Sequence, residues 1–297
     1  MPSIRGVLPA LVTPLDAAGR LDRAGLDRLL DHVLAAPLAG IAPGGSTGEG
    51  PLLSPEQRVE LAGAVRARLT ADQWLVPGVP APTAAAALGE IEALAGAGAS
   101  AVLLPPPWYY PLGPAEVVRY FTTVADAAAL PLVLYNIPRF TKVSLDPEVV
   151  AELAGHPRIV GTKDSSGDLE HLTRTTRLTA ATDDFSVLTG TDGSFLDALT
   201  AGGEGLIGAS VNVAPGFAQG VYDAARAGDA DEARAVQGRI AAVVAACDQL
   251  GFPTGWKAAL HVLGVCGSDP AHPLPGPDPA GLPALRATLA GLGLTGD

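Results

Sequence analysis

Short apolar runs alternate with amphipathic stretches from the start of the chain to about residue 225. Each run is rich in Val, Ile, Leu or Ala and ends in a turn signal, which is typical of a buried strand. The stretches between the runs place apolar residues at helical spacing. The predicted strands are residues 7–13, 40–43, 74–79, 101–104, 131–135, 159–163, 185–188 and 205–208.

Helix-start signals follow most of these strands. Asp22 can cap a helix that reaches about residue 35, and Ser54 precedes Pro55 and Gln57 in the pattern of a capping box. Further helices are expected at 83–97, from Pro114 and from Pro147. Eight strands, each followed by a helical pattern, predict a closed (β/α)8 TIM barrel rather than an open doubly wound sheet. The first strand is not followed by Gly-x-Gly-x-x-Gly, which weakens a dinucleotide-binding interpretation.

After residue 225 the strand pattern stops. Residues 230–250 and 255–263 are predicted helices, the 267–279 stretch is rich in Pro and Gly, and a last helix is expected near 282–292. We therefore expect a barrel at residues 1–225 and a small C-terminal helical segment, residues 226–297, packed on it.

Composition narrows the possible partners. The formal net charge of −12 and the isoelectric point near 4.8 argue against nucleic acid and against an anionic membrane surface. Cys247, Cys266 and the scattered histidines lack metal-ligand spacing, so neither a metal nor a separate cofactor is expected. We expect neither a signal sequence nor a membrane span, because the first residues show no cleavage signal and no apolar stretch reaches about 18 residues. These features predict a soluble, cytoplasmic protein.

Lys163 is the first candidate for chemistry, because it ends the apolar run 159–163 and is followed by a polar turn. Lysine otherwise occurs only at positions 142 and 257. In a parallel barrel Lys163 would lie at the carboxyl end of a strand, where active sites form. Desolvation disfavours the ammonium form there, which suits an amine that attacks a carbonyl group. The alternative is a lysine that extends out of the sheet to pair with Asp164.

Three more clusters follow strand ends. The 44–50 loop, Gly-Gly-Ser-Thr-Gly-Glu-Gly, can turn backbone N–H groups toward a small anion such as a carboxylate, or it can be a flexible turn. Tyr135 can transfer a proton near an imine, or it can be an ordinary interior aromatic. The segment Trp108-Tyr109-Tyr110 can border a site, or form a hydrophobic loop or a subunit contact.

Taken together, the motifs resemble the pyruvate-dependent class I aldolases of the dihydrodipicolinate synthase and N-acetylneuraminate lyase group. The resemblance rests on Leu11-Val12-Thr13-Pro14, Gly45-Ser46-Thr47-Gly48-Glu49, Pro107-Trp108-Tyr109-Tyr110, Tyr135-Asn136-Ile137-Pro138 and Gly161-Thr162-Lys163. These motifs occur in the order of the family, and the resemblance extends through residues 203–213.

The resemblance implies a role for each residue. Lys163 would form a Schiff base with pyruvate or another 2-oxo acid, and Tyr135 would be the general acid and base. Ser46 and Tyr109 would extend a hydroxyl relay, with Tyr109 coming from a neighbouring subunit of a homotetramer. The predicted substrate-binding residues are Thr47, Gly45, Ile207, Gly208, Arg139, Gly190 and Thr191.

Departures from the family pattern bear on the second substrate. Dihydrodipicolinate synthases resemble Tyr-Asn-x-Pro-x-Arg-Thr-Gly, whose arginine pairs with a carboxylate of the aldehyde. Here Phe140 stands in that place, Arg139 comes one residue earlier and Lys142 replaces the glycine. In this respect the chain more closely resembles the sugar-acid and hydroxy-oxoacid aldolases of the family, and the resemblance implies a lyase that cleaves a 2-keto-3-deoxy sugar acid or 4-hydroxy-2-oxoglutarate and releases pyruvate or glyoxylate. The alternatives are a 4-hydroxy-tetrahydrodipicolinate synthase, a Schiff-base dehydratase or deaminase, and a barrel that only binds a 2-oxo acid.

Overall fold

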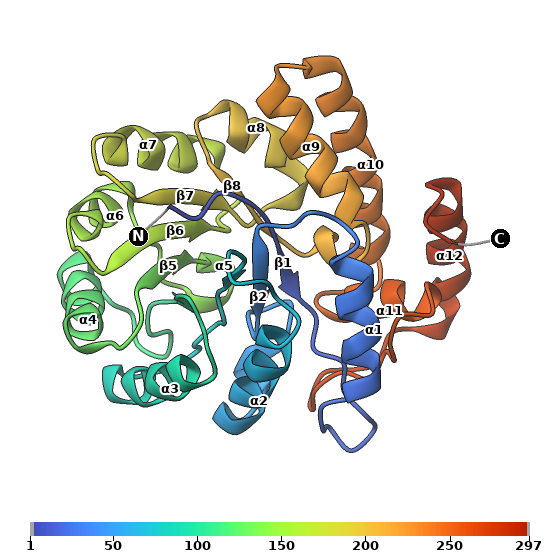
Figure 1. The fold of residues 1–297 in the computed structure, drawn as a ribbon, viewed down its shortest axis with the longest axis horizontal. Coiled ribbons are helices and arrows are strands. Elements are labelled where there is room, and N and C mark those ends of the chain that lie inside the picture. The colour runs from blue at the N-terminus through green and yellow to red at the C-terminus, as the bar shows by residue number, and fades with distance from the viewer. Residues whose placement is uncertain (1–2, 296–297) are drawn as a thin grey trace.

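The computed structural model describes residues 3–295 and shows parallel strands curled into a barrel and enclosed by helices (Figure 1). The sheet order is β3-β2-β1-β8-β7-β6-β5-β4. An isolated bridge between Gly78 and Leu103 joins its two edges and closes the barrel. The predicted (β/α)8 barrel is therefore confirmed. The strands are β1 (Gly6–Leu11), β2 (Gly40–Pro43), β3 (Trp74–Leu75), β4 (Val102–Leu104), β5 (Leu132–Asn136), β6 (Ile159–Asp164), β7 (Ser186–Thr189) and β8 (Gly205–Gly208).

The helices of the barrel begin close to their sequence signals. Asp22, Ser54 and Thr83 each accept a backbone N–H of the helix that they cap, and Ser54 with Gln57 forms the expected capping box. The barrel helices are α1 (Arg23–Val33), α2 (Pro55–Arg66), α3 (Ala84–Gly96), α4 (Pro114–Ala127), α5 (Pro138–Thr141), α6 (Pro147–Ala154), α7 (Leu169–Thr179), α8 (Phe195–Thr200) and α9 (Pro215–Ala227). Short 3₁₀ turns lie at η1 (Gly50–Leu52), η2 (Asp192–Ser194) and η3 (Ser210–Asn212).

The third strand is shorter than the sequence pattern suggested. The expected range was 74–79, whereas β3 ends at Leu75. Pro77 has no N–H to donate to a neighbouring strand, so a regular ladder cannot continue through it. The segment stays extended nevertheless, because Val79 N donates to Leu103 O at 2.9 Å.

Apolar side chains form two layers. A small inner cluster fills the barrel and includes Leu8, Val133, Leu188 and Ile207. A larger cluster lies between the strands and the surrounding helices. This division follows from the alternation of side chains along each strand.

Three helices follow the barrel: α10 (Ala230–Asp248), α11 (Thr254–Val262) and α12 (Leu282–Gly291), with η4 (Pro279–Gly281) before the last. They lie on one side of the barrel, and α12 is outermost (Figure 1). The expected boundary at residue 225 falls inside α9, against which α10 packs. No helix in the described part of the chain is long and apolar enough to cross a membrane.

Candidate active site

Lys163 lies inside the barrel because β6 contains a bulge. Leu132 pairs with Ile159, but the next residue, Val133, pairs with Gly161, so Val160 is an extra residue in β6. Without it, strict alternation would put Lys163 on the same outer face as Ile159. The bulge changes the phase, and Lys163 pairs with Tyr135 in β5 on the inner face. Its side chain is buried, with 4% of the residue exposed.

Two hydroxyl groups form a chain of polar contacts that begins at the Lys163 amine. Lys163 Nζ lies 3.4 Å from Tyr135 Oη, which lies 3.5 Å from Ser46 Oγ. The amine is also 4.5 Å from the centroid of the Tyr135 ring. Both hydrogen bonds are long, so the phenol is near the amine without binding it strongly. The structure thus brings together three of the four predicted catalytic residues.

A cavity of about 370 Å³ opens above Lys163. It is lined by the predicted residues Thr47, Tyr135, Arg139, Lys163, Gly190, Thr191 and Ile207. A second, mainly apolar cavity of about 290 Å³ lies on the other side of Tyr135 and contains Gly45 and Ser46. The predicted carboxylate loop therefore faces both cavities.

The wall opposite Tyr135 is shaped by two glycines and a buried acid. A Cβ at Gly190 would lie 1.9 Å from Ser165 Oγ and 2.5 Å from Lys163 Cε, so a larger residue there would displace both side chains. Gly208 is not part of the cavity lining; a Cβ there would lie 2.3 Å from Asp192 Oδ1. Asp192 accepts hydrogen bonds from Ser210 N at 2.9 Å and from Ala209 N at 3.1 Å. Burial raises the pKa of Asp192, while Ser210, Ala209 and the Lys163 charge oppose that rise.

Asp192 is not among the residues predicted from the sequence, although its neighbours Gly190 and Thr191 were predicted to bind the substrate. An acid inside a Gly-rich turn at a strand end was the signal available. The residue lines the Lys163 cavity, and its charge is coupled to that of the lysine.

The 44–50 loop is held from below by packing and by a buried ion pair. A Cβ on Gly50 would lie 1.7 Å from Gly44 O, so the loop closes on itself without room for a side chain. Thr13 Oγ1 donates to Gly48 O at 2.6 Å. Arg58 donates to Gly50 O at 2.8 Å and is paired with Glu90. Among residues 3–295 the backbone N–H groups of Ser46 and Thr47 have no acceptor, so both are free to bind an anion.

The C-terminal segment supports the same loop. Glu49, in a left-handed backbone conformation, forms an ion pair with Lys257 of α11 at 2.6 Å, and both side chains are almost fully buried. Glu49 also accepts the N–H of Ala271. The segment contributes Asp248, Phe252 and Trp256 to the Lys163 cavity as well. It is therefore part of the site, which the sequence analysis did not anticipate.

Arg139 lies at the mouth of the cavity. The one-turn helix α5 presents Arg139 and Phe140, and the Arg139 guanidinium carbon is 5.2 Å and 5.6 Å from the ring centroids of Phe140 and Phe252. The backbone of Lys142 adopts the left-handed conformation after this helix, and its Nζ donates to Arg139 O at 2.8 Å. Lys142 thus occupies a position that favours glycine, which explains the glycine of the resembled motif.

Tyr109 lies outside its own chain's site. It is 80% exposed and forms an edge-to-face pair with the exposed Tyr110, with ring centroids 5.0 Å apart. Trp108, by contrast, lines the apolar cavity. The predicted relay within one chain therefore ends at Ser46.

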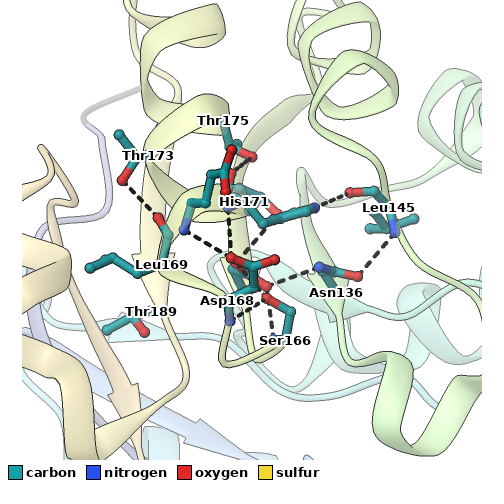
Figure 2. A network of polar contacts seen from close by, with 12 residues as sticks. Asn136, Leu145, Ser166, Asp168, Leu169, His171, Thr173, Thr175 and Thr189 are labelled. Carbon is teal, nitrogen blue, oxygen red and sulfur yellow. Dashed lines mark hydrogen bonds and ion pairs between the residues drawn. The ribbon is translucent and has the colours of Figure 1, made fainter.

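Asp164 is not a partner of Lys163, so the alternative interpretation of that lysine fails. As neighbours in a strand, the two side chains point to opposite faces. The Asp164 carboxylate instead accepts hydrogen bonds from Asn136, Ser166 and His171. Figure 2 shows this outer network.

Comparison with known proteins agrees with the motifs. Residues 3–290 match the model of the dihydrodipicolinate synthetase family. The chain belongs to this family. Its members make or break carbon–carbon bonds, and the protein is accordingly an enzyme of the lyase class.

Among family relatives, the chain is 34% identical to the 4-hydroxy-tetrahydrodipicolinate synthase of Methanoculleus marisnigri, over 97% of this chain and 99% of that one. It is 35% identical to an uncharacterized DapA-like lyase of Halobacterium salinarum, over 98% and 95% of the two chains. Among solved structures it resembles YagE, a prophage protein of the family from E. coli K12 in complex with pyruvate. That likeness has a TM-score of 0.92 and 29% identity, and covers 98% and 99% of the chains.

Proposed function

We propose that the protein is a pyruvate-dependent aldolase that works through an imine on Lys163. The neutral amine attacks the ketone of a 2-oxo acid to give a carbinolamine, which takes up one proton, loses water and becomes a protonated imine. This imine takes up the electron pair when a C3–C4 bond breaks, or yields an enamine that attacks an aldehyde. No separate cofactor is needed for either direction. The burial of Lys163 beside Tyr135 is the observation that carries this proposal.

Tyr135 is the proposed proton carrier. Its hydroxyl lies between the amine and Ser46, so it can take a proton from one side and give it to the other. The N–H groups of Ser46 and Thr47 are proposed to bind the carboxylate of the 2-oxo acid, which would orient its ketone toward Lys163.

For the second substrate we favour aspartate semialdehyde, hence the 4-hydroxy-tetrahydrodipicolinate synthase reaction. Several relatives near 34% identity carry that name, although Phe140 in place of the motif arginine favours the other reaction. The cavity mouth also supports it, because the Lys163 cavity is lined by an exposed cation, Arg139, and an exposed anion, Asp248. Aspartate semialdehyde carries a carboxylate and an ammonium group, and each would meet an opposite charge.

Phe140 supports a second candidate, retro-aldol cleavage of a sugar acid or of 4-hydroxy-2-oxoglutarate. Phe140 is 44% exposed, and its ring lies 5.5 Å from the Phe252 ring, centroid to centroid. These rings occupy the approach where a directed guanidinium would otherwise bind a carboxylate. Of these two substrates the sugar acid suits the rings better, because it carries only hydroxyl groups beyond its reacting carbons, whereas 4-hydroxy-2-oxoglutarate carries a second carboxylate there.

Parallel assays separate the two reactions. Condensation of pyruvate with aspartate semialdehyde is expected, with little pyruvate release from 2-keto-3-deoxy sugar acids or 4-hydroxy-2-oxoglutarate. Arg139→Ala should raise the KM for aspartate semialdehyde by about 10-fold or more, because a charge-assisted hydrogen bond is worth roughly 1.5–3 kcal/mol. The KM for pyruvate should stay the same. Arg119→Ala on α4, an exposed arginine paired with Glu116, is the matched control. Lack of condensation at saturating substrates, with release from a sugar acid, would favour the second candidate.

We also propose that a second copy of the chain completes the site. Tyr109 is too exposed to act within its own chain, and a neighbour could bring it to Ser46. A homotetramer is the expected assembly. Sedimentation equilibrium at micromolar concentration measures it, and a monomer with full activity would overturn this proposal. One related solved structure is of a monomeric dihydrodipicolinate synthase variant.

A further inference from the structure

A closed ring of four residues lies just outside the barrel, behind the site. Asn136 Nδ2 donates to Asp164 Oδ1 at 2.9 Å, and Leu145 N donates to Asn136 Oδ1 at 3.0 Å. His171 Nε2 is 2.9 Å from Leu145 O, and its Nδ1 is 3.1 Å from Asp164 Oδ2. In Figure 2 the dashed lines from His171 and Asn136 both reach Leu145. The ring therefore joins β5, β6, α7 and the segment before α6.

His171 must carry two protons to complete this ring. Both partners of the imidazole are acceptors, a carboxylate and a backbone carbonyl, whereas a neutral imidazole has a single N–H. The His171 side chain is 13% exposed and that of Asp164 is 4% exposed, so water screens their interaction little.

The surrounding charges favour the cation. The hydrogen bond to Asp164 raises the pKa of His171, burial opposes the rise, and Asp168 at the start of α7 adds to it. Glu148 of α6 forms an exposed ion pair with Arg174 of α7. The two opposite charges cancel, so this pair adds no net charge near His171.

On both strands, a residue of the ring directly follows a residue of the proposed catalytic pair. Asn136 follows Tyr135 and Asp164 follows Lys163, and both pairs stand side by side in the β5–β6 register. The bond between Tyr135 and Lys163 is long at 3.4 Å, so it cannot align the two groups by itself. Alignment must come from the backbone, and a displacement of about 1 Å in an active site can cost on the order of 100-fold in rate.

Building on the proposed imine chemistry, we infer that His171 is a positioning residue. As a doubly hydrogen-bonded cation it closes the ring that holds the ends of β5 and β6 in register, and thereby aligns the Lys163 amine with the Tyr135 hydroxyl. His171 does not touch the substrate. Its loss affects the rate of imine formation, while the 44–50 loop still binds the carboxylate.

The test compares His171→Gln with His156→Gln in the full chain. His156 makes a matched contact, because its Nε2 is 3.1 Å from Asp126 Oδ1, but it follows α6 at the other end of the barrel strands. The rate of borohydride-trapped adduct formation on Lys163 is measured with pyruvate from pH 6 to 9. For His171→Gln we expect a fall of about 10-fold or more near neutral pH, with the half-saturating pyruvate concentration changed less than about 2-fold. His156→Gln should match the wild type.

The pH profile separates positioning from a general loss of fold. The wild-type rate should decline toward that of His171→Gln as His171 loses its second proton, and the variant should lack this decline. Equal rates and profiles in the wild type and His171→Gln would overturn the positioning role. A wild type that forms no adduct on Lys163 would instead overturn the proposed function.

If His171→Gln does not fold, the inference can still be tested on the wild-type protein. Nitrogen-15 NMR of the His171 ring should show two protonated nitrogens at pH 7. A neutral tautomer at that pH would overturn the inference.

Discussion

Replacing Lys257 by methionine removes one charge from a buried pair. The Lys257 and Glu49 side chains are 1% and 0% exposed, with Nζ and Oε1 2.6 Å apart. Lys257 Nζ also donates to Asp269 O at 2.6 Å. Lys257→Met would leave the Glu49 carboxylate buried without its counter-charge. Breaking such a pair costs roughly 3–5 kcal/mol, against a total stability of about 5–15 kcal/mol for an ordinary domain.

The assay is urea unfolding followed by circular dichroism, which gives the free energy of unfolding. The control is Arg234→Ala, because the pair of Arg234 with Asp231 has side chains 66% and 98% exposed and should contribute about 0–1 kcal/mol. The double variant Glu49→Gln with Lys257→Met should regain a large part of the loss, since no lone charge remains. A cost for Lys257→Met below about 1 kcal/mol, or equal to that of Arg234→Ala, would refute the assignment of this pair as a support of the loop.

Two more predictions address the cavity wall and the outer ring. Gly190→Ala should prevent adduct formation with pyruvate while the chain stays folded, because the new methyl would displace Ser165 Oγ and Lys163 Cε. Gly193→Ala, with nothing within 4 Å of the new atom, should leave adduct formation unchanged. Equal adduct yields from the two variants would contradict this steric argument. For His171, whose folded-state pKa is raised above the unfolded value, the stabilising contribution is fully present below about pH 6.5 and is lost as pH rises through the folded-state pKa. The difference in unfolding free energy between the wild type and His171→Gln should therefore shrink from pH 6 to pH 9, and a constant difference would speak against a charged His171.

The alternation of strands and helices could be predicted because each element carries its own local signal. A parallel strand buried on both faces is apolar throughout, and the caps at Asp22, Ser54 and Thr83 act within a few residues. The same local signal overestimated β3, where Pro77 interrupts the ladder without changing the apolar pattern.

The direction of the Lys163 side chain could not be predicted from periodicity. The bulge at Val160 depends on the pairing of β6 with β5, and nothing in the run 159–163 marks it. A regular strand of the same sequence would place Lys163 toward the helices.

Contacts between residues far apart in the sequence could not be predicted either. Glu49 was read only as part of a loop, yet its carboxylate accepts the N–H of Ala271, 222 positions later. Asp248, Phe252 and Trp256 gave a helical pattern with no sign that they line the cavity. Such contacts arise from the packing of α10 and α11 on the barrel. The sequence motifs therefore identified Lys163, Tyr135 and the 44–50 loop, whereas only the structure identified the cavity residues of the C-terminal segment.

Borohydride reduction in the presence of pyruvate tests the central claim most directly. Intact mass and peptide mapping would locate any reduced adduct, with Lys163→Ala as the control. We predict one adduct per chain, on Lys163, and none in the variant. An unmodified Lys163 at saturating pyruvate and at every 2-oxo acid tested would contradict the imine mechanism and leave a binding barrel as the remaining interpretation.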